Sequence, residues 1–206
     1  MPDLERPQIY LITPPELELS SFTNVLSSVL DANTVACIRL ALSSEDETHI
    51  QRTADGLRDI CHARDIPLVI QTHFNLVEKL GLDGVHLTDG SKNVRQVRKD
   101  LGSDAIIGAH CAISRHDGMN AAEAGVDYVS FGPVGHTALG DGKTAPLDLF
   151  QWWSEVIEVP IVAEGGLDEK TIASLSEITD FAAIGSEIWS ADDPAKRLQE
   201  LAKILA

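Results

Sequence analysis

The sequence has little cysteine and is short of positive charge. Its three cysteines are odd in number, widely spaced and form no C-x-x-C pair: Cys37, Cys61 and Cys111. This pattern suggests neither a disulfide framework nor a zinc knuckle, so we expect reduced thiols. Lys and Arg number 16 against 32 Asp and Glu, for a formal net charge of -16. Such a charge opposes broad attraction to nucleic acid or to an anionic membrane, and we expect neither as a partner.

Long apolar runs and targeting signals are also missing. No run approaches the roughly 18 apolar residues that a membrane helix needs. The amino terminus, MPDLERPQ, lacks the basic and apolar regions of a secretory signal. We therefore expect a cytoplasmic protein. Neither a G-x-G-x-x-G motif nor a P-loop follows the first apolar run, IYLIT at 9–13, which weakens the case for an open doubly wound sheet.

Short apolar, β-rich runs alternate with amphipathic segments along the whole chain. Between the runs, apolar residues return every three or four positions, for example at 46–63 and 194–205, which predicts helices. Continuous apolar strands alternating with helices are typical of a parallel sheet covered by helices. Eight units in 206 residues fit one domain, a single (β/α)8 TIM barrel over 1–206. The eight runs are 9–13, 35–39, 67–71, 84–87, 105–109, 128–132, 160–164 and 181–185.

A faint internal repeat supports this count. The segments LDGVHL at 82–87, VDYVSFG at 126–132 and TDFAAIG at 179–185 each place an Asp just before an apolar run. Similarity that recurs along a chain indicates repeated structural units.

The loop after the sixth run carries several groups that can contact a ligand. In a TIM barrel, the loops after the carboxyl ends of the strands build the active face. Glycines in the segment 132–143 let the backbone approach a ligand, Thr137 offers a hydroxyl, and Lys143 supplies a cation. The alternative is a flexible surface loop.

Small residues follow the last two runs. Gly165 and Gly166 come after the seventh run, and Gly185 and Ser186 come after the eighth. These are the loops where TIM barrels most often present backbone N–H groups to a phosphate. We therefore predict a phosphate site there. Arg39, at the end of the second run, could clamp an anionic group in bidentate fashion, and the alternative is a salt bridge at the rim.

Taken together, several of these segments resemble the thiamine phosphate synthase and thiazole tautomerase family over nearly the full chain. The segments are YLIT, GLDGVHL, VDYVSFGPV with a following Thr, PIVAEGGL and FAAIGS. The resemblance implies a TIM barrel that holds thiazole phosphate on the loops after strands 6 to 8. In the synthases, Mg²⁺ and basic residues hold a hydroxymethylpyrimidine diphosphate, diphosphate leaves, and the thiazole nitrogen captures the pyrimidine carbocation.

Compared residue by residue, one side of the expected site keeps the family's residues and the other does not. The family's Arg-x-Lys at strand 2 keeps Arg39 but has Ala41 at the lysine position. Where the synthases have Asn-Asp after strand 3, this chain has Gln71 and Thr72, and Ser91 stands at the acid of the family's Gly-Gln-x-Asp. The side expected to hold thiazole phosphate is retained. Its residues are Thr137, Gly165, Gly166, Gly185 and Ser186.

The diphosphate and metal side offers only partial replacements. Asp89 lies two places before the expected acid, His110 replaces the serine expected after strand 5, and Lys143 falls three residues beyond the family's lysine. We therefore predict Arg39, His110 and Lys143 as catalytic residues, with Mg²⁺ on Asp89 as a possible cofactor.

Histidines and acids stand at other strand ends. His73, His86, His110 and His136 lie at or just beyond runs three to six, so several could face one cavity. They could bind a metal if three ligands converge, His110 could serve as a general acid or base, or all could be ordinary hydrogen-bonded side chains.

Glu164 and Glu187 flank the predicted phosphate loops. A carboxylate beside a phosphate costs Coulomb energy, so each should point away or accept a hydrogen bond from the ligand. Cys111, next to His110, should face away from it as a core or rim residue.

Trp152 and Trp153 are neighbours in a predicted helix. Neighbours on a helix lie about 100° apart, so both cannot face the barrel. At least one should be exposed or covered by a second copy, which predicts a homodimer.

Three functions remain open at this point. The first is a synthase of the thiamine phosphate type with weak or lost turnover. The second is an isomerase of the thiazole tautomerase type, which needs a base but no metal. The third is a non-catalytic barrel that binds a phosphorylated heterocycle.

Overall fold

The computed structural model describes residues 6–135 and 142–205, which form a closed barrel of eight parallel strands. Each strand pairs with the next along the chain, and β1 pairs with β8. This closure confirms the predicted TIM barrel and excludes the open doubly wound sheet. The strands are β1 (Gln8–Ile12), β2 (Cys37–Leu40), β3 (Leu68–Gln71), β4 (Gly84–Leu87), β5 (Ile106–His110), β6 (Tyr128–Phe131), β7 (Ile161–Glu164) and β8 (Phe181–Ile184).

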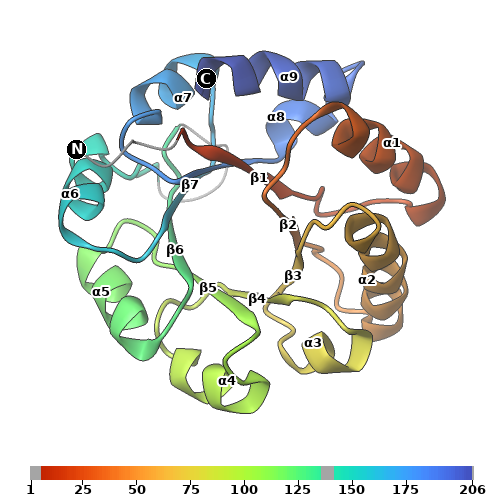
Figure 1. Ribbon diagram of the computed structural model, residues 1–206, viewed down its shortest axis with the longest axis horizontal. Coiled ribbons are helices and arrows are strands. Elements are labelled where there is room, and N and C mark those ends of the chain that lie inside the picture. Colours follow the sequence, from red (N-terminus) through yellow and green to blue (C-terminus); the bar gives the residue numbers. More distant parts are fainter. Residues whose placement is uncertain (1–5, 136–141, 206) are drawn as a thin grey trace.

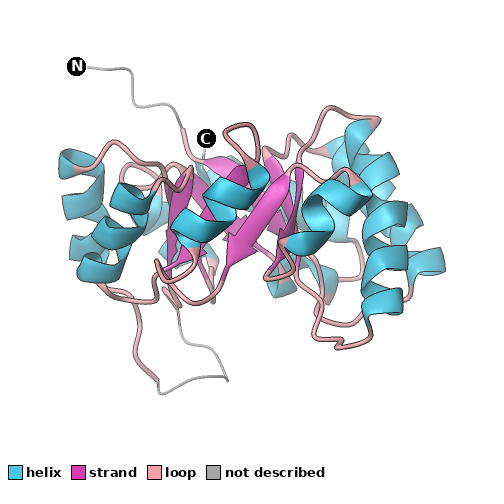
Figure 2. Ribbon diagram, turned by 90° about the horizontal axis from the view of Figure 1, so that it is seen from below, coloured by secondary structure: helices cyan, strands magenta, loops and turns pink. Residues whose placement is uncertain are grey.

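Helices surround the barrel and bury one face against it. Figure 1 shows them as an outer ring around the strands, and Figure 2 shows helices on both sides of the central strands. Both helices expected at 46–63 and 194–205 are present, as α2 and α9. Their bounds are α1 (Leu19–Ala32), α2 (Glu47–His62), α3 (Asn75–Leu80), α4 (Val94–Leu101), α5 (Arg115–Ala124), α6 (Leu147–Val156), α7 (Glu169–Leu175), α8 (Ser186–Trp189) and α9 (Pro194–Leu205).

The strands alternate between two apolar layers, as a period of two requires. Leu11 and Ile38 join the large cluster between the strands and the helices, whereas Tyr10, Cys37 and Tyr128 join a smaller cluster inside the barrel. The smaller cluster also contains Val69, Val162 and Ala183. This smaller cluster lies toward the amino ends of the strands, and Arg39, two residues beyond Cys37 on β2, faces the same interior nearer the carboxyl end.

Gly108 makes room for an aromatic pair inside the barrel. A Cβ at Gly108 would lie 2.0 Å from the Tyr128 ring, so only glycine fits there. The Tyr128 hydroxyl lies 2.7 Å from the hydroxyl of Tyr10 on the other side of the barrel. The barrel interior is thus filled partly by hydrogen-bonded polar groups.

The repeated aspartates have one common role at the amino ends of the strands. Asp83 accepts a hydrogen bond from the N–H of Leu68 at 2.7 Å, and Asp180 accepts one from Ile161 at 2.8 Å. Asp127, the third, accepts from Ile107 at 2.7 Å. Each aspartate therefore joins the start of its own strand to the preceding strand. It accepts a hydrogen bond from a backbone N–H group that has no partner in the sheet.

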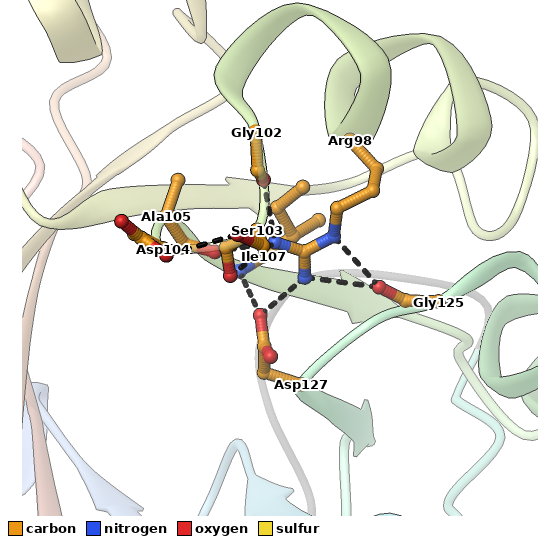
Figure 3. A network of polar contacts seen from close by, with 8 residues as sticks. All are labelled: Arg98, Gly102, Ser103, Asp104, Ala105, Ile107, Gly125 and Asp127. Carbon is orange, nitrogen blue, oxygen red and sulfur yellow. Dashed lines mark hydrogen bonds and ion pairs between the residues drawn. The ribbon is translucent and has the colours of Figure 1, made fainter.

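Arg98 on α4 reinforces the middle one of these contacts (Figure 3). Its Nη2 atom lies 2.6 Å from Oδ2 of Asp127, and its Nη1 atom donates to the carbonyl oxygen of Ala105 at 2.7 Å. The same guanidinium donates to the carbonyl of Gly125. This network lies away from the carboxyl ends of the strands, where polar contacts contribute to stability and not to chemistry.

The two adjacent tryptophans divide as expected. Trp153 is fully buried against the barrel, whereas Trp152 is only partly buried and lies 4.9 Å below the guanidinium of Arg115. Arg115 thus covers Trp152 within the same chain by a cation–π contact. The homodimer stays a prediction, as does the single domain over 1–206.

Among the described residues, no helix combines the length and the hydrophobicity that crossing a bilayer would require.

Candidate functional site

The loops after β6 and β7 are in direct backbone contact. The N–H groups of Val134 and Gly135 donate to the carbonyl oxygen of Gly165 at 3.0 and 2.9 Å. Gly166 has a φ of +70°, and a Cβ there would lie 2.9 Å from the backbone of Gly135. The Gly-Gly pair is therefore required by a left-handed conformation and by a close approach of two loops.

These loops, together with the loop after β8, line a cavity of about 760 Å³. Gly166 and Ser186, two residues of the predicted phosphate site, both contribute to its wall. Two cations that the sequence reading missed, Lys170 of α7 and Arg197 of α9, line it as well. Their signal in the sequence was weak because each belongs to a helix that is otherwise an ordinary outer layer. Thr137, predicted beside them, lies outside the described residues.

Glu187 holds backbone N–H groups of two of these loops. Its carboxylate accepts hydrogen bonds from the N–H of Gly185 at 2.8 Å and from the N–H of Leu167 at 3.1 Å. We expected Glu187 either to point away from the site or to accept a hydrogen bond from the ligand. The structure shows a third arrangement, in which the carboxylate accepts hydrogen bonds from the backbone of the protein itself. An anion that used the Gly185 N–H would have to displace this carboxylate.

Replacing Glu187 by alanine is expected to raise the affinity for inorganic phosphate at least tenfold, or about 1.4 kcal/mol. The change removes a like charge and releases two N–H donors at the place where a phosphate would bind. Titration calorimetry with phosphate measures the effect, and Glu78→Ala on the distant helix α3 is the control. Unchanged or weaker affinity would show that Glu187 builds the site and does not compete with the anion.

Arg39 lies inside the barrel and is paired. Its side chain is 6% exposed, and its Nη1 atom lies 2.9 Å from Oε2 of Glu164 on β7. The salt bridge that was the alternative prediction is present, but it lies inside the barrel and not at the rim, because the alternation along β2 directs Arg39 inward. Its Nε atom has no hydrogen-bond partner among the described residues. Its predicted role as an anion clamp stays untested.

Glu164 is the centre of a polar cluster that is largely but not fully buried. The Nδ1 atom of His110 lies 3.1 Å from Oε1 of Glu164 and 3.0 Å from Oγ of Ser130. Burial alone would raise the pKa of Glu164, but Arg39 and the hydrogen bond from His110 outweigh it and lower that pKa well below its ordinary value. The carboxylate is therefore charged throughout the physiological range.

Two of the strand-end histidines converge with Glu164. Each of three residues offers one possible metal-ligand atom, and these three atoms lie within 4.8 Å of one another: His86, His110 and Glu164. His73 is directed elsewhere, with Nδ1 3.0 Å from the carbonyl oxygen of Gln71. His136 lies outside the described residues. The sequence signal for this cluster was present but not sufficient, since it required knowing which inward side chains meet.

Asp89 and Lys143 are both exposed on the loops. Asp89 accepts a hydrogen bond from Nδ2 of Asn93 at 2.6 Å. Within residues 6–135 and 142–205, the one group of three or more possible metal ligands is the histidine–glutamate cluster, and Asp89 is not part of it. Mg²⁺ prefers oxygen ligands, so the protein groups found here do not fit the Mg²⁺ that the family resemblance implied.

Cys111 is buried, as expected for a core residue. Burial raises the pKa of its thiol to about 12, so it stays protonated and unreactive.

Two residues at the carboxyl ends of strands have left-handed backbone conformations without being glycine. Thr72 after β3 has a φ of +69°, and Ala112 after β5 has a φ of +47°. Such conformations are costly and cluster at ligand sites. They lie on the same side of the barrel as the cavity and the buried cluster.

The fold and the candidate site together define a TIM-barrel protein with small-residue loops after β6, β7 and β8 around one cavity, at the end of the barrel where the active sites of this fold lie. The chain belongs to the thiamine monophosphate synthase family, whose family model matches residues 9–188. The predicted family is thus confirmed.

Relatives of known name agree over nearly the whole chain. The chain is 37% identical over 185 residues to the thiamine-phosphate synthase of Rhodospirillum centenum, with 89% of each chain covered. It is 36% identical over 194 residues to that of Erythrobacter litoralis, with 91% of each covered. The thiamine phosphate pyrophosphorylase from Pyrococcus furiosus shares the fold with a TM-score of 0.82 at 22% identity, covering 96% of this chain and 95% of that one.

Proposed function

We propose that this protein is a transferase of the thiamine-phosphate synthase type, which joins a hydroxymethylpyrimidine diphosphate to thiazole phosphate. The observation that carries the proposal is a single cavity lined by all three of the loops after β6, β7 and β8, in a chain that belongs to this family. Gly135, Gly166 and Ser186 are the residues that these loops contribute. The phosphate of the thiazole substrate would bind backbone N–H groups near Gly166 and Ser186. Lys170 and Arg197 bring positive charge to the cavity wall, although Arg197 is paired with Glu169 at 2.8 Å and with Glu200 at 3.4 Å. A protein of net charge -16 needs such placed cations in order to hold an anion.

The diphosphate side of the same site is weaker. Arg39 is neutralised by Glu164 at 2.9 Å, and Ala41 and Thr72 bring no charge. We propose that Arg39, His110 and Lys143 contact the diphosphate substrate, with Arg39 giving up part of its pairing to do so. Turnover should therefore be slow compared with a synthase that has a full set of charges.

One observation favours a second function, an isomerase of the tautomerase type. His110 lies at the carboxyl end of β5, partly exposed, with Nδ1 3.1 Å from a carboxylate oxygen of Glu164. A histidine oriented by a carboxylate is a common arrangement for a general base. Such a reaction needs a base and no metal.

A charge change at Ser186 tests the assigned phosphate position. Ser186 is exposed in the cavity wall, so Ser186→Glu should fold and should weaken binding of thiazole phosphate at least tenfold by like-charge repulsion. Gly166 is less suitable, since its positive φ and its contact with Gly135 would strain any side chain. The measurement is titration calorimetry.

The matched control is Ser190→Glu, an exposed serine at the end of the same short helix that does not line the cavity. Unchanged affinity in folded Ser186→Glu protein would contradict the assignment. Release of inorganic diphosphate in an assay with both substrates then separates the transferase from the isomerase, because the isomerase releases none.

A further inference from the structure

The cluster of buried His86 with partly exposed His110 and Glu164 has the composition of a transition-metal site. Two imidazoles and a carboxylate suit Zn²⁺, Co²⁺ or Ni²⁺, whereas Mg²⁺ prefers oxygen alone. We propose that these three residues bind a divalent cation of the zinc type at the carboxyl end of the barrel interior. The proposal does not rest on the proposed function, although the site shares His110 with the diphosphate contacts proposed above.

The spacing of the donor atoms is close to that of a metal site. All three lie within 4.8 Å of one another. Ligands about 2.0–2.1 Å from a tetrahedral Zn²⁺ lie about 3.4 Å apart. His110 Nδ1 and Glu164 Oε1 lie 3.1 Å apart, near this spacing, and a metal between them would replace their hydrogen bond and release the Nδ1 proton. Small side-chain shifts of His86 would complete the set.

His86 is the residue that points most directly to a ligand. It is 1% exposed, and its Nδ1 atom lies 2.9 Å from the Tyr128 hydroxyl. Its Nε2 atom is buried and has no hydrogen-bond partner within the part of the chain that the structure describes. When Nδ1 donates to the Tyr128 hydroxyl, Nε2 carries the lone pair that a ligand can use. Metal-binding histidines are oriented by such a hydrogen bond at the other nitrogen.

Glu164 is held in place by Arg39. Because Arg39 takes Oε2 at 2.9 Å, the other oxygen, Oε1, is the one that faces His110. The guanidinium also repels a second cation, so we expect weaker binding than at a zinc site with four protein ligands. Three protein ligands leave a fourth position for water or an anion, and an anion there would offset the positive charge.

Titration of the full-length, metal-free protein with Co²⁺ and with Zn²⁺ tests the proposal. We expect one Co²⁺ per chain with the intense visible absorption of a four-coordinate site, displaced by Zn²⁺ and unaffected by excess Mg²⁺. His110→Gln and Glu164→Gln should each lower the Zn²⁺ affinity at least tenfold. The test leaves out His86→Gln, because a substitution at a buried residue can prevent folding.

The control is His62→Gln, which removes a histidine of an exposed pair with Asp83, 2.8 Å apart, at the opposite end of the barrel. It should leave Zn²⁺ binding unchanged. Weak, six-coordinate Co²⁺ absorption in the wild-type protein, or full Zn²⁺ affinity in folded His110→Gln, would overturn the proposal. Neither result would bear on the phosphate loops, which the Ser186 variant tests separately.

Discussion

Glu164→Leu protein is expected to be less stable than wild type by about 3–5 kcal/mol in urea unfolding of the metal-free protein. The substitution leaves the guanidinium of Arg39 uncompensated in a position where it is only 6% exposed. A buried charge without a partner is far more costly than a lost surface contact.

A double variant separates charge imbalance from lost packing. Arg39→Met with Glu164→Leu removes both charges and should lose less stability than Glu164→Leu alone. Arg64→Met is the control, because it breaks a pair with Asp31 at the same 2.8 to 2.9 Å distance but with the side chains 26% and 64% exposed. It should cost about 1 kcal/mol or less. Single changes that add up to the double change would contradict this account.

The ion pair of Arg39 and Glu164 also makes the free energy of unfolding depend on pH. Because the pKa of Glu164 is lowered in the folded protein, the unfolded state binds its proton first as the pH falls. The stabilisation is complete above the unfolded value of about 4.3 and is lost as the pH falls through the folded pKa. Glu164→Leu should therefore reduce the loss of stability on acidification.

The triple variant Ala41→Lys, Thr72→Asp and Ser91→Asp is expected to raise Mg²⁺-dependent synthase turnover at least a hundredfold, or about 2.7 kcal/mol. These positions lie at the carboxyl ends of β2, β3 and β4, where charge would stabilise a departing diphosphate. Thr72 has a φ of +69°, and aspartate tolerates that conformation better than β-branched threonine, so the change should also relieve strain. Release of inorganic diphosphate measures turnover.

Chelation of Mg²⁺ is the control, since it should abolish the gain. Rapid Mg²⁺-dependent synthesis by the unmodified protein would contradict the interpretation that the diphosphate side of the site is weakened. It would show that Asp89, Lys143 or a histidine has taken over the missing roles.

The barrel could be predicted because its signal is local. Apolar runs and helical periodicity repeat along the chain, and all eight predicted runs coincide with strands to within two residues. The largest difference is at β2, which begins at Cys37 and not at residue 35, although Ala36 already donates to Ile9.

The contacts within the site were harder to predict, because they join residues far apart in sequence. Arg39 and Glu164 are separated by 125 positions, and alternation along a strand gives the face of a side chain but not its partner across the barrel. Glu187 is a different case. Its bonds to Gly185 and Leu167 depend on the conformations of two loops, for which the sequence carried only the glycines.

The repeated aspartates have a consequence for how the chain assembles. Asp83, Asp127 and Asp180 close contacts over only 15, 20 and 19 residues, and each joins two strands that a single helix connects. These units, β3 with β4, β5 with β6 and β7 with β8, can complete their polar contacts as soon as they are synthesised. The first strand can pair early with β2, but its other edge pairs with β8, which leaves the ribosome near the end. The part of the barrel that is made first is therefore among the last to be finished.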